Sequence, residues 1–172
     1  CKGNILNIEQ GASENMSMFC PNCMAELEDG TVRCPNCGGD TSIKNKPHQL
    51  PTDTILNGRY IVGKAIGEGG FGITYVGYDL KLHAKVAIKE YFPAGSVTRT
   101  AETTVYAMDT SPESAFALGK AKFVAESQVL AQFLDEPNIV SVRDYFEENN
   151  TAYIVMEFLE GKSLHQVLKE RG

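Results

Sequence analysis

The sequence lacks three features that would each place it in a particular class of protein. No apolar run approaches the roughly 20 residues that a membrane-spanning helix needs. Sixteen Lys and Arg residues stand against 22 Asp and Glu residues, so a net charge of −6 leaves no basic surplus for displacing counterions from nucleic acid. The N-terminus has neither the apolar core nor the cleavage site of a secretory signal. These absences argue against nucleic acid as a partner and predict a cytoplasmic chain, with a downstream membrane anchor left open.

The overall composition is that of a globular protein, but both ends of the chain are unusual. Hydrophobic residues make up 42% and charged residues 22%, which indicates a soluble fold of one domain, or of a small domain beside a medium one. The first residue is Cys1, and residues 1–17 show no helical or strand period, so we expect a disordered or untranslated leader. The last residues stop within an expected helix. Both ends predict a fragment of a longer protein.

Four of the five cysteines form two identical Cys-Pro-Asn-Cys motifs, Cys20/Cys23 and Cys34/Cys37. At this spacing four thiolates can surround one tetrahedral zinc ion at about 2.3 Å each, which leaves no position open for water. We therefore expect a structural zinc ribbon over residues 18–39 that folds with its metal, with a short hairpin between the motifs. Two disulfides or redox dithiols are the alternative, which the missing secretory signal disfavours. Because basic residues are few here, a protein partner of the ribbon is favoured over nucleic acid.

A polar stretch separates the ribbon from a region of different pattern. Residues 40–55 are rich in Thr, Ser, Lys, Asn and Pro, and we expect a flexible linker. Beyond it, residues 59–66 and 73–78 are expected strands on either side of the glycine-rich segment 67–72. Glycine lets backbone N–H groups approach phosphate oxygens without a Cβ in the way. A dinucleotide fold would need a helix directly after these glycines, and a strand follows instead.

The next segment indicates which nucleotide site this is. Residues 85–89 read Lys-Val-Ala-Ile-Lys, a strand in which Ala87 and Lys89 share one face. A small residue beside a lysine leaves room for a flat base while the ammonium reaches phosphates. A glycine-rich hairpin followed by Val-Ala-Ile-Lys is the signature set of protein kinases. From residue 56 to residue 172 the chain resembles the N-terminal lobe of a bacterial eukaryotic-type Ser/Thr protein kinase.

The resemblance implies an α+β fold, in which a five-stranded antiparallel sheet packs with one long helix beside the small zinc ribbon. It implies that Lys89 and Glu126 are the catalytic ion pair that holds the nucleotide phosphates, with Met156 as gatekeeper and the backbone of Glu157 and Leu159 at the adenine edge. The full implied set of ATP contacts is Ile66, Gly67, Glu68, Gly69, Gly70, Phe71, Gly72, Ile73, Thr74, Ala87, Lys89, Met156, Glu157 and Leu159. Thr74 departs from the family's usual Val, although its methyl group can make the same contact.

Helix and strand signals continue to the end of the chain. Ser111 and Pro112 predict the start of a helix that runs to about Leu134, with Phe123 and Glu126 on one face. Residues 139–146 and 152–158 are expected strands, and threonines between residues 98 and 105 suggest an extra strand pair. Ser163 and Gln166 form a capping box for a last helix.

The sequence contains no His-Arg-Asp catalytic loop and no Asp-Phe-Gly motif. The resemblance therefore implies that the Mg²⁺ ligands, the base and the substrate platform belong to a missing part of the parent protein. That parent is expected to transfer the γ-phosphoryl group of Mg-ATP to Ser or Thr hydroxyls of protein substrates, while the chain alone is expected to be inactive. The alternative is a pseudokinase or zinc-ribbon adaptor that acts only by binding nucleotide or protein.

Overall fold

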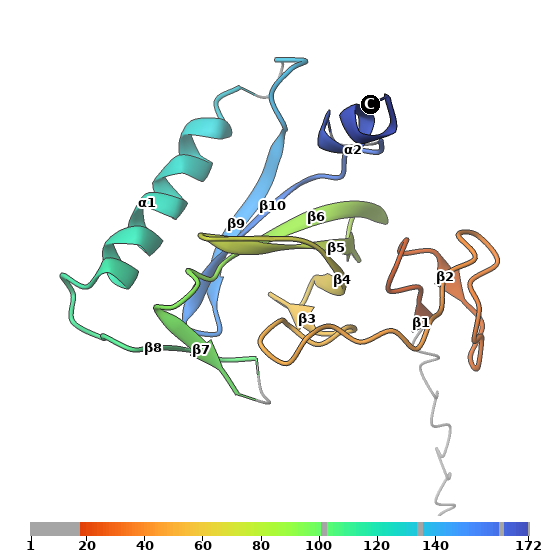
Figure 1. Ribbon diagram of the computed structural model, residues 1–172, viewed down its shortest axis with the longest axis horizontal. Helices are drawn as coiled ribbons and strands as arrows, with labels where there is room; N and C mark the ends of the chain where they lie inside the picture. The colour runs from red at the N-terminus through yellow and green to blue at the C-terminus, as the bar shows by residue number, and fades with distance from the viewer. Residues whose placement is uncertain (1–17, 101–102, 134–135, 162–163, 172) are drawn as a thin grey trace, which may run out of the picture.

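The computed structural model describes residues 18–171 apart from 101–102, 134–135 and 162–163 (Figure 1). The expected leader over residues 1–17 and the Ser163 end of the capping box lie outside the described residues. Two folded units follow one another along the chain. A small two-stranded unit holds the cysteines, and a larger sheet with one long helix follows it.

The small unit is built around the two cysteine motifs. Strands β1 (Met18–Phe19) and β2 (Glu26–Leu27) pair antiparallel on either side of the first motif. An isolated bridge between Arg33 and Asp40 encloses the second motif in the same way. The hairpin expected between the motifs is therefore wrong in position. The chain pairs across each motif because the turns that bring two sulfurs together also bring their flanking strands together.

The large sheet contains six strands in the order β3-β4-β5-β6-β10-β9, and every neighbouring pair is antiparallel. The five expected strands are present, and the two-residue β3 extends the sheet at one edge. Their bounds are β3 Ile55–Leu56, β4 Tyr60–Gly69, β5 Gly72–Asp79, β6 Ala84–Tyr91, β9 Val142–Glu148 and β10 Thr151–Glu157. The expected extra pair is also present, as β7 (Val97–Arg99) and β8 (Val105–Ala107).

The long helix α1 spans Ala115–Leu130, so it begins later and ends earlier than the sequence predicts. Ser114 is its N-cap, because the Ser114 side chain accepts a hydrogen bond from the Ala117 N–H. Ser111 instead starts a turn, in which the Ser114 N–H donates to the Ser111 carbonyl at 3.0 Å. The predicted end at Leu134 lies outside the described residues. A second helix, α2, spans Leu164–Arg171.

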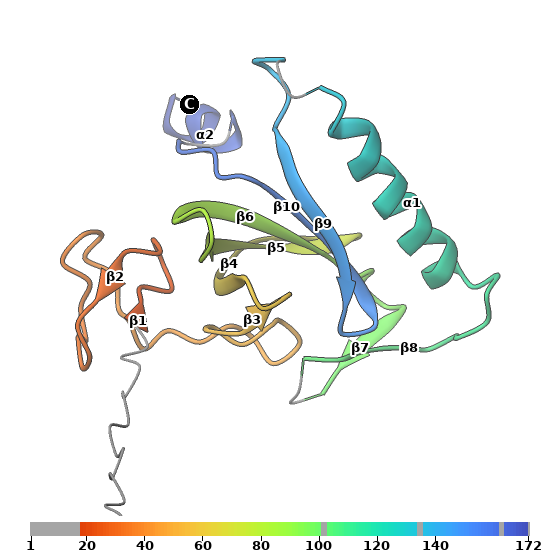
Figure 2. The same cartoon turned by 180° about the vertical axis from the view of Figure 1, so that it is seen from behind.

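The two faces of the sheet are covered by different parts of the chain. Cross-strand partners share a face, so Tyr75, Ile88 and Val155 point to one side, where they belong to the main hydrophobic core. The other side meets α1 at one end and the cysteine unit at the opposite end (Figures 1 and 2). Phe19 contacts Tyr78 there, with ring centroids 4.6 Å apart.

Much of the segment 40–55, expected as a flexible linker, lies against the sheet. Leu50 is fully buried in the main core, and its N–H donates to the Tyr75 hydroxyl at 3.0 Å. Asn45 bonds to the backbone of β4, as described below. The polar composition of this stretch reflects side chains that bond to the sheet, which composition alone does not distinguish from solvated side chains.

Candidate functional site

The glycine-rich hairpin is formed by β4, β5 and the turn at Gly70 and Phe71. A Cβ on Gly72 would lie 2.2 Å from the carbonyl oxygen of Glu90, so glycine is required there for close packing of β5 on β6. Gly67, Gly69 and Gly70 have no such internal reason. A Cβ at Gly69 or Gly70 would meet nothing within 4 Å, and one at Gly67 would make only an ordinary 3.9 Å contact. The open space at these three glycines lets a ligand approach the backbone closely.

Strand register brings the other predicted side chains to one face beside this turn. Thr74 pairs with Lys89, and Ala87 pairs with both Val76 and Met156. Thr74, Ala87, Lys89 and Met156 therefore lie together on one side of the sheet, as the alternation in residues 85–89 predicts. Ala87 is the smallest of them and is buried.

The remaining predicted contacts are placed less uniformly. Ile66, Phe71 and Leu159 are exposed around this face, Phe71 with 80% of its surface accessible. Ile73 is only 1% exposed, and its side chain lies in the main core on the opposite face. Because the strand alternates, the Ile73 side chain faces away from the site, and only the Ile73 backbone can contribute to the predicted nucleotide contacts. Glu157 turns its carboxylate to the Ser141 N–H at 2.8 Å, which fixes the end of β10.

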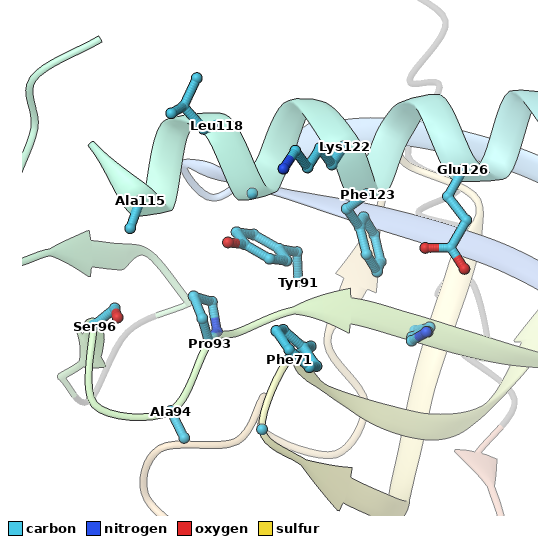
Figure 3. Close-up of a pocket in the computed structure, with 13 residues that line it drawn as sticks. Phe71, Tyr91, Pro93, Ala94, Ser96, Ala115, Leu118, Lys122, Phe123 and Glu126 are labelled. Atoms are coloured by element: carbon cyan, nitrogen blue, oxygen red, sulfur yellow. The ribbon is translucent and has the colours of Figure 1, made fainter. Parts of the chain in front are cut away.

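Lys89 and Glu126 line one pocket of about 730 Å³ between α1, the end of β6 and the glycine-rich turn (Figure 3). They do not form an ion pair within 4.0 Å in the described part of the chain. The Lys89 ammonium instead lies 5.6 Å from the ring centroid of Phe123, one helical turn before Glu126. Glu126 is exposed and points from α1 into the pocket. The predicted pair thus shares a cavity, with its two charges apart.

A tyrosine and a helical glycine set the position of α1, and the sequence reading missed both. Tyr91 lies under the helix, with its ring centroid 5.5 Å from those of both Phe116 and Phe123 (Figure 3). A Cβ on Gly119 would lie 2.0 Å from the Tyr91 hydroxyl oxygen. Glycine in a helix interior costs about 1 kcal/mol relative to alanine. The available signal was this unfavourable glycine, which here makes room for Tyr91.

Glu90, the neighbour of Lys89, is fully buried on the other face of β6. Its carboxylate accepts hydrogen bonds from the hydroxyls of Tyr75 and Tyr153, each at 2.9 Å, and pairs with the buried guanidinium of Arg99. Burial, and next the charge of Glu90, raise the pKa of both tyrosines above the usual range, so they remain donors. Arg99 also donates to the carbonyl oxygen of His48 at 2.9 Å. This network ties residues 48–50 to the strand that carries Lys89.

The four cysteine sulfurs converge as the sequence predicts. All four ligand atoms lie within 4.8 Å of one another, with Cys20–Cys37 and Cys23–Cys34 sulfur distances of 3.7 Å. Four sulfurs at about 2.3 Å from one tetrahedral ion lie about 3.8 Å apart, so the arrangement fits zinc. A disulfide needs a sulfur separation of about 2.05 Å, which these distances exceed.

Hydrogen bonds favour the thiolate at Cys34, whereas the pKa of Cys20 is raised, mainly by burial, and the pKa of Cys37 also lies above its usual value. The backbone N–H of Cys37 is the main reason that the pKa of Cys34 falls to about 7, against the effect of its burial. The side-chain amide of Asn36 reaches the Cys23 sulfur at 3.5 Å, and that of Asn22 reaches the Cys20 sulfur at 3.9 Å. The same residue type at the same place in both motifs was the signal for this supporting role.

Comparison with known proteins identifies the larger unit. Residues 60–172 match the model of the protein kinase domain. The chain belongs to the protein kinase family. Its kinase lobe superposes on the solved structure described as "PpkA-294 apo form" with a TM-score of 0.66 and 33% sequence identity, over 72% of this chain and 43% of that one.

Curated relatives include bacterial serine/threonine-protein kinases and calcium-dependent protein kinases of Arabidopsis thaliana. Serine/threonine-protein kinase B of Synechocystis is 29% identical over 159 residues, 90% of this chain, so the similarity extends from the kinase lobe into the residues before Tyr60. PrkC of Bacillus subtilis is 33% identical over 117 residues, 68% of this chain. The chain spans 23% and 15% of the lengths of these two relatives. Among the described residues, no helix is long and apolar enough to cross a membrane.

Proposed function

We propose that this chain is the ATP-binding lobe of a protein serine/threonine kinase, whose parent transfers the γ-phosphoryl group of ATP to Ser or Thr hydroxyls of protein substrates. The observation that carries this proposal is the single pocket that Lys89 and Glu126 share with Gly70 and Phe71 of the glycine-rich turn. A cation, a carboxylate and open backbone N–H groups at one place are the parts that position a triphosphate.

Each part of the lobe has a proposed task in that chemistry. Ala87, Thr74 and Met156 form the apolar roof for adenine, and the backbone of Glu157 and Leu159 meets its polar edge. The open glycines let N–H groups approach the phosphates, and Lys89 supplies a fixed positive charge beside them. A bound Mg²⁺ supplies further neutralisation of phosphate charge, and none of the residues assigned in this lobe is its ligand.

The separation of Lys89 from Glu126 gives α1 a role in switching. The ammonium lies by Phe123, so pairing with the Glu126 carboxylate requires the two side chains to turn toward each other across the pocket or α1 to move over Tyr91. The structure of the lobe with its helix in this position therefore corresponds to a form in which Lys89 is not yet held against the nucleotide. Pairing would raise the fraction of time that Lys89 spends at the phosphates.

A kinase assay on the full-length protein tests this proposal. Lys89→Met removes the charge and should lower kcat/KM for ATP by about 100-fold or more, as loss of a transition-state electrostatic contact does. Lys81→Ala is the matched control, because Lys81 is an exposed lysine in the turn between β5 and β6, outside the pocket. Nucleotide binding without any phosphoryl transfer by the unmutated protein would instead support the pseudokinase alternative.

We further propose that the cysteine unit holds one structural zinc ion and acts through protein contact, first of all with its own kinase lobe. The fit of the four sulfurs to a tetrahedral ion and the contact of Phe19 with Tyr78 support both parts. A four-cysteine metal site in place of disulfides is typical of a reducing compartment such as the cytoplasm. Elemental analysis of the purified chain should give one zinc per chain, and none for the Cys20→Ser/Cys34→Ser variant. One zinc per chain in both proteins would contradict the assignment.

A further inference from the structure

The free edge of β4 is covered by residues that precede the kinase lobe. β4 is the outer strand of the glycine-rich hairpin, and β3 pairs only with its first two residues. The Val62 N–H donates to the Thr54 carbonyl and the Val62 carbonyl accepts from the Asp53 N–H, both at 2.8 Å. The Lys64 N–H donates to the Pro21 carbonyl of the first cysteine motif at 2.7 Å. Groups that an edge strand leaves unpaired are thus satisfied from outside the lobe.

Asn45 continues this cover with a single side chain. Its amide nitrogen donates to the Gly63 carbonyl at 2.9 Å, and its amide oxygen accepts from the Ala65 N–H at 2.9 Å. The same nitrogen donates to the Leu50 carbonyl at 2.8 Å, which ties the 45–50 segment into a fixed loop. The β4–β5 pairing shifts register on both sides of Ala65, so the carboxamide replaces a strand partner at an irregular position.

These contacts along the edge of β4 end at Glu68, which lies near the end of β4 within the glycine-rich segment 67–72. Its carboxylate receives His48 Nε2 at 2.8 Å, Gln49 Nε2 at 3.0 Å and Lys46 Nζ at 3.3 Å. The pKa of Glu68 lies below its usual range, mainly because of the bond to His48. Three donors from one short segment therefore hold one carboxylate that lies between two open glycines, Gly67 and Gly69.

This arrangement has two physical consequences for the turn. A glycine-rich segment loses more conformational freedom on ordering than other chains do, so an anchor that already fixes it lowers the entropy lost on binding. An unpaired carboxylate at Glu68 would also repel phosphates that approach the neighbouring glycines. Hydrogen bonds from Lys46, His48 and Gln49 direct the carboxylate to the outer edge of β4, and the Lys46 ammonium offsets its charge.

We propose that Lys46, His48 and Gln49 form a positioning clamp that holds the glycine-rich turn through Glu68 and thereby sets the affinity of the lobe for a nucleoside triphosphate. The part of this proposal that concerns nucleotide rests on the proposed function above. The part that concerns the turn does not, because it can be measured without nucleotide.

Hydrogen exchange of the 172-residue chain tests the clamp first. His48→Ala and Glu68→Gln should each speed exchange of the amide hydrogens of residues 66–73 by about three- to tenfold, as expected for loss of a hydrogen bond to a charged group. The double variant should be no faster than the faster of the two single variants, since His48 acts on the turn only through Glu68. Lys44→Ala is the matched control, an exposed lysine of the same segment with no ion pair in the described part of the chain.

Residues 151–157 of β10 report whether any change is local. Their exchange should stay unchanged in every variant, whereas a variant that loosens the whole lobe would speed it too. His48→Gln keeps a side-chain donor and should retain most of the protection. Additive effects of the two single variants, or no change in residues 66–73, would overturn the clamp whatever the protein does with ATP.

Steady-state kinetics of the full-length kinase then test the nucleotide part. His48→Ala, at a residue outside the implied ATP contacts, should raise KM for ATP by about three- to tenfold and leave kcat within about twofold, because the clamp acts before chemistry. A fall in kcat at constant KM would refute this role. An inactive unmutated protein would contradict the proposed function, and the exchange result on the clamp would still stand.

Discussion

The cysteine unit and the kinase lobe are both folded, but different interactions hold them. The lobe has a continuous core over six strands and α1, whereas the buried cluster within the cysteine unit consists of Cys20, Leu27 and Cys34. Two of these three are proposed metal ligands. Phe19 and Met24, the larger side chains of the unit, pack in a cluster with Ile61 and Val76 of the lobe. A small unit with little core of its own can thus be stabilised by a metal site on one side and by packing on the sheet of the adjoining lobe on the other.

Metal removal should separate the two regions most strongly. Structural zinc contributes on the order of 10 kcal/mol to small domains of this kind, so Cys34→Ser or a strong chelator should unfold residues 18–39. The lobe should keep its slow hydrogen exchange in β10, because its core contains no cysteine ligand. Hydrogen exchange of both regions measures this, with Cys1→Ser as a control outside the two motifs. If the amide hydrogens of residues 18–39 exchange as slowly with the chelator as without it, the cysteine unit does not depend on a metal.

The buried ion pair of Glu90 and Arg99 allows a test of what stabilises the core of the lobe. Glu90→Gln should lower the free energy of unfolding by about 3–5 kcal/mol, because it leaves the fully buried Arg99 guanidinium without its counter-charge. Urea unfolding followed by circular dichroism measures the change. Replacing both members, as Glu90→Leu/Arg99→Met, should cost clearly less than the sum of the two single changes. A cost below about 1 kcal/mol for Glu90→Gln would show that water reaches the pair and screens it.

The contact between the two regions can be tested at Gly63. A Cβ there would lie 2.0 Å from Met24 Cε and 2.7 Å from the Pro21 carbonyl oxygen, so Gly63→Ala forces the cysteine unit away from β4. We expect a loss of about 1–3 kcal/mol, the usual range for overpacking. Met24→Ala in the same chain should restore part of it, since the carbonyl contact remains. Gly69→Ala, where a Cβ meets nothing within 4 Å, is the control, and an equal loss there would contradict the contact.

The smallest expected effect is on how the stability of the kinase lobe falls at acid pH. Burial raises the pKa of Asp79. Hydrogen bonds from Arg59 and from the N–H groups of Leu82 and Lys81 lower it by more than burial raises it, so the net pKa lies below the usual value. This carboxylate stabilises the lobe fully above the ordinary Asp pKa of about 3.9, and the contribution is lost as the pH falls through the lower folded pKa. Asp79→Asn should flatten the decline in urea midpoint below about pH 4. If the urea midpoint of Asp79→Asn falls with pH as steeply as that of the unmutated chain, other groups cause the loss of stability at acid pH.

The parts of the structure that the sequence predicts are those whose signals are local. The two cysteine motifs, the glycine-rich hairpin and the Val-Ala-Ile-Lys strand each lie within a few residues, so spacing alone determines their geometry. Alternation then placed Thr74, Ala87 and Lys89 on one face. The same rule places Glu90 on the core face, and a buried carboxylate requires a partner, which is Arg99 nine residues later.

The parts that the sequence did not predict depend on contacts between distant segments. Ser111 and Ser114 are both acceptable N-caps, and the packing of Phe116 on Tyr91 selects the later one. The distance between Lys89 and Glu126 depends on how α1 sits over Tyr91, which no local pattern specifies. Residues 40–54 look flexible by composition because their partners on β4 are about twenty positions away.

The alternation of Lys89 and Glu90 also bears on how the sheet reaches one alignment. A slip of β6 by a single position would bring Lys89 among the tyrosines of the core and put Glu90 beside the glycines of the turn. The core would then hold two cations, Lys89 and Arg99, and no anion, while a second carboxylate would join Glu126 in the pocket. Misaligned sheets are thus penalised electrostatically on both faces at once, and adjacent residues of opposite charge select the native pairing during folding.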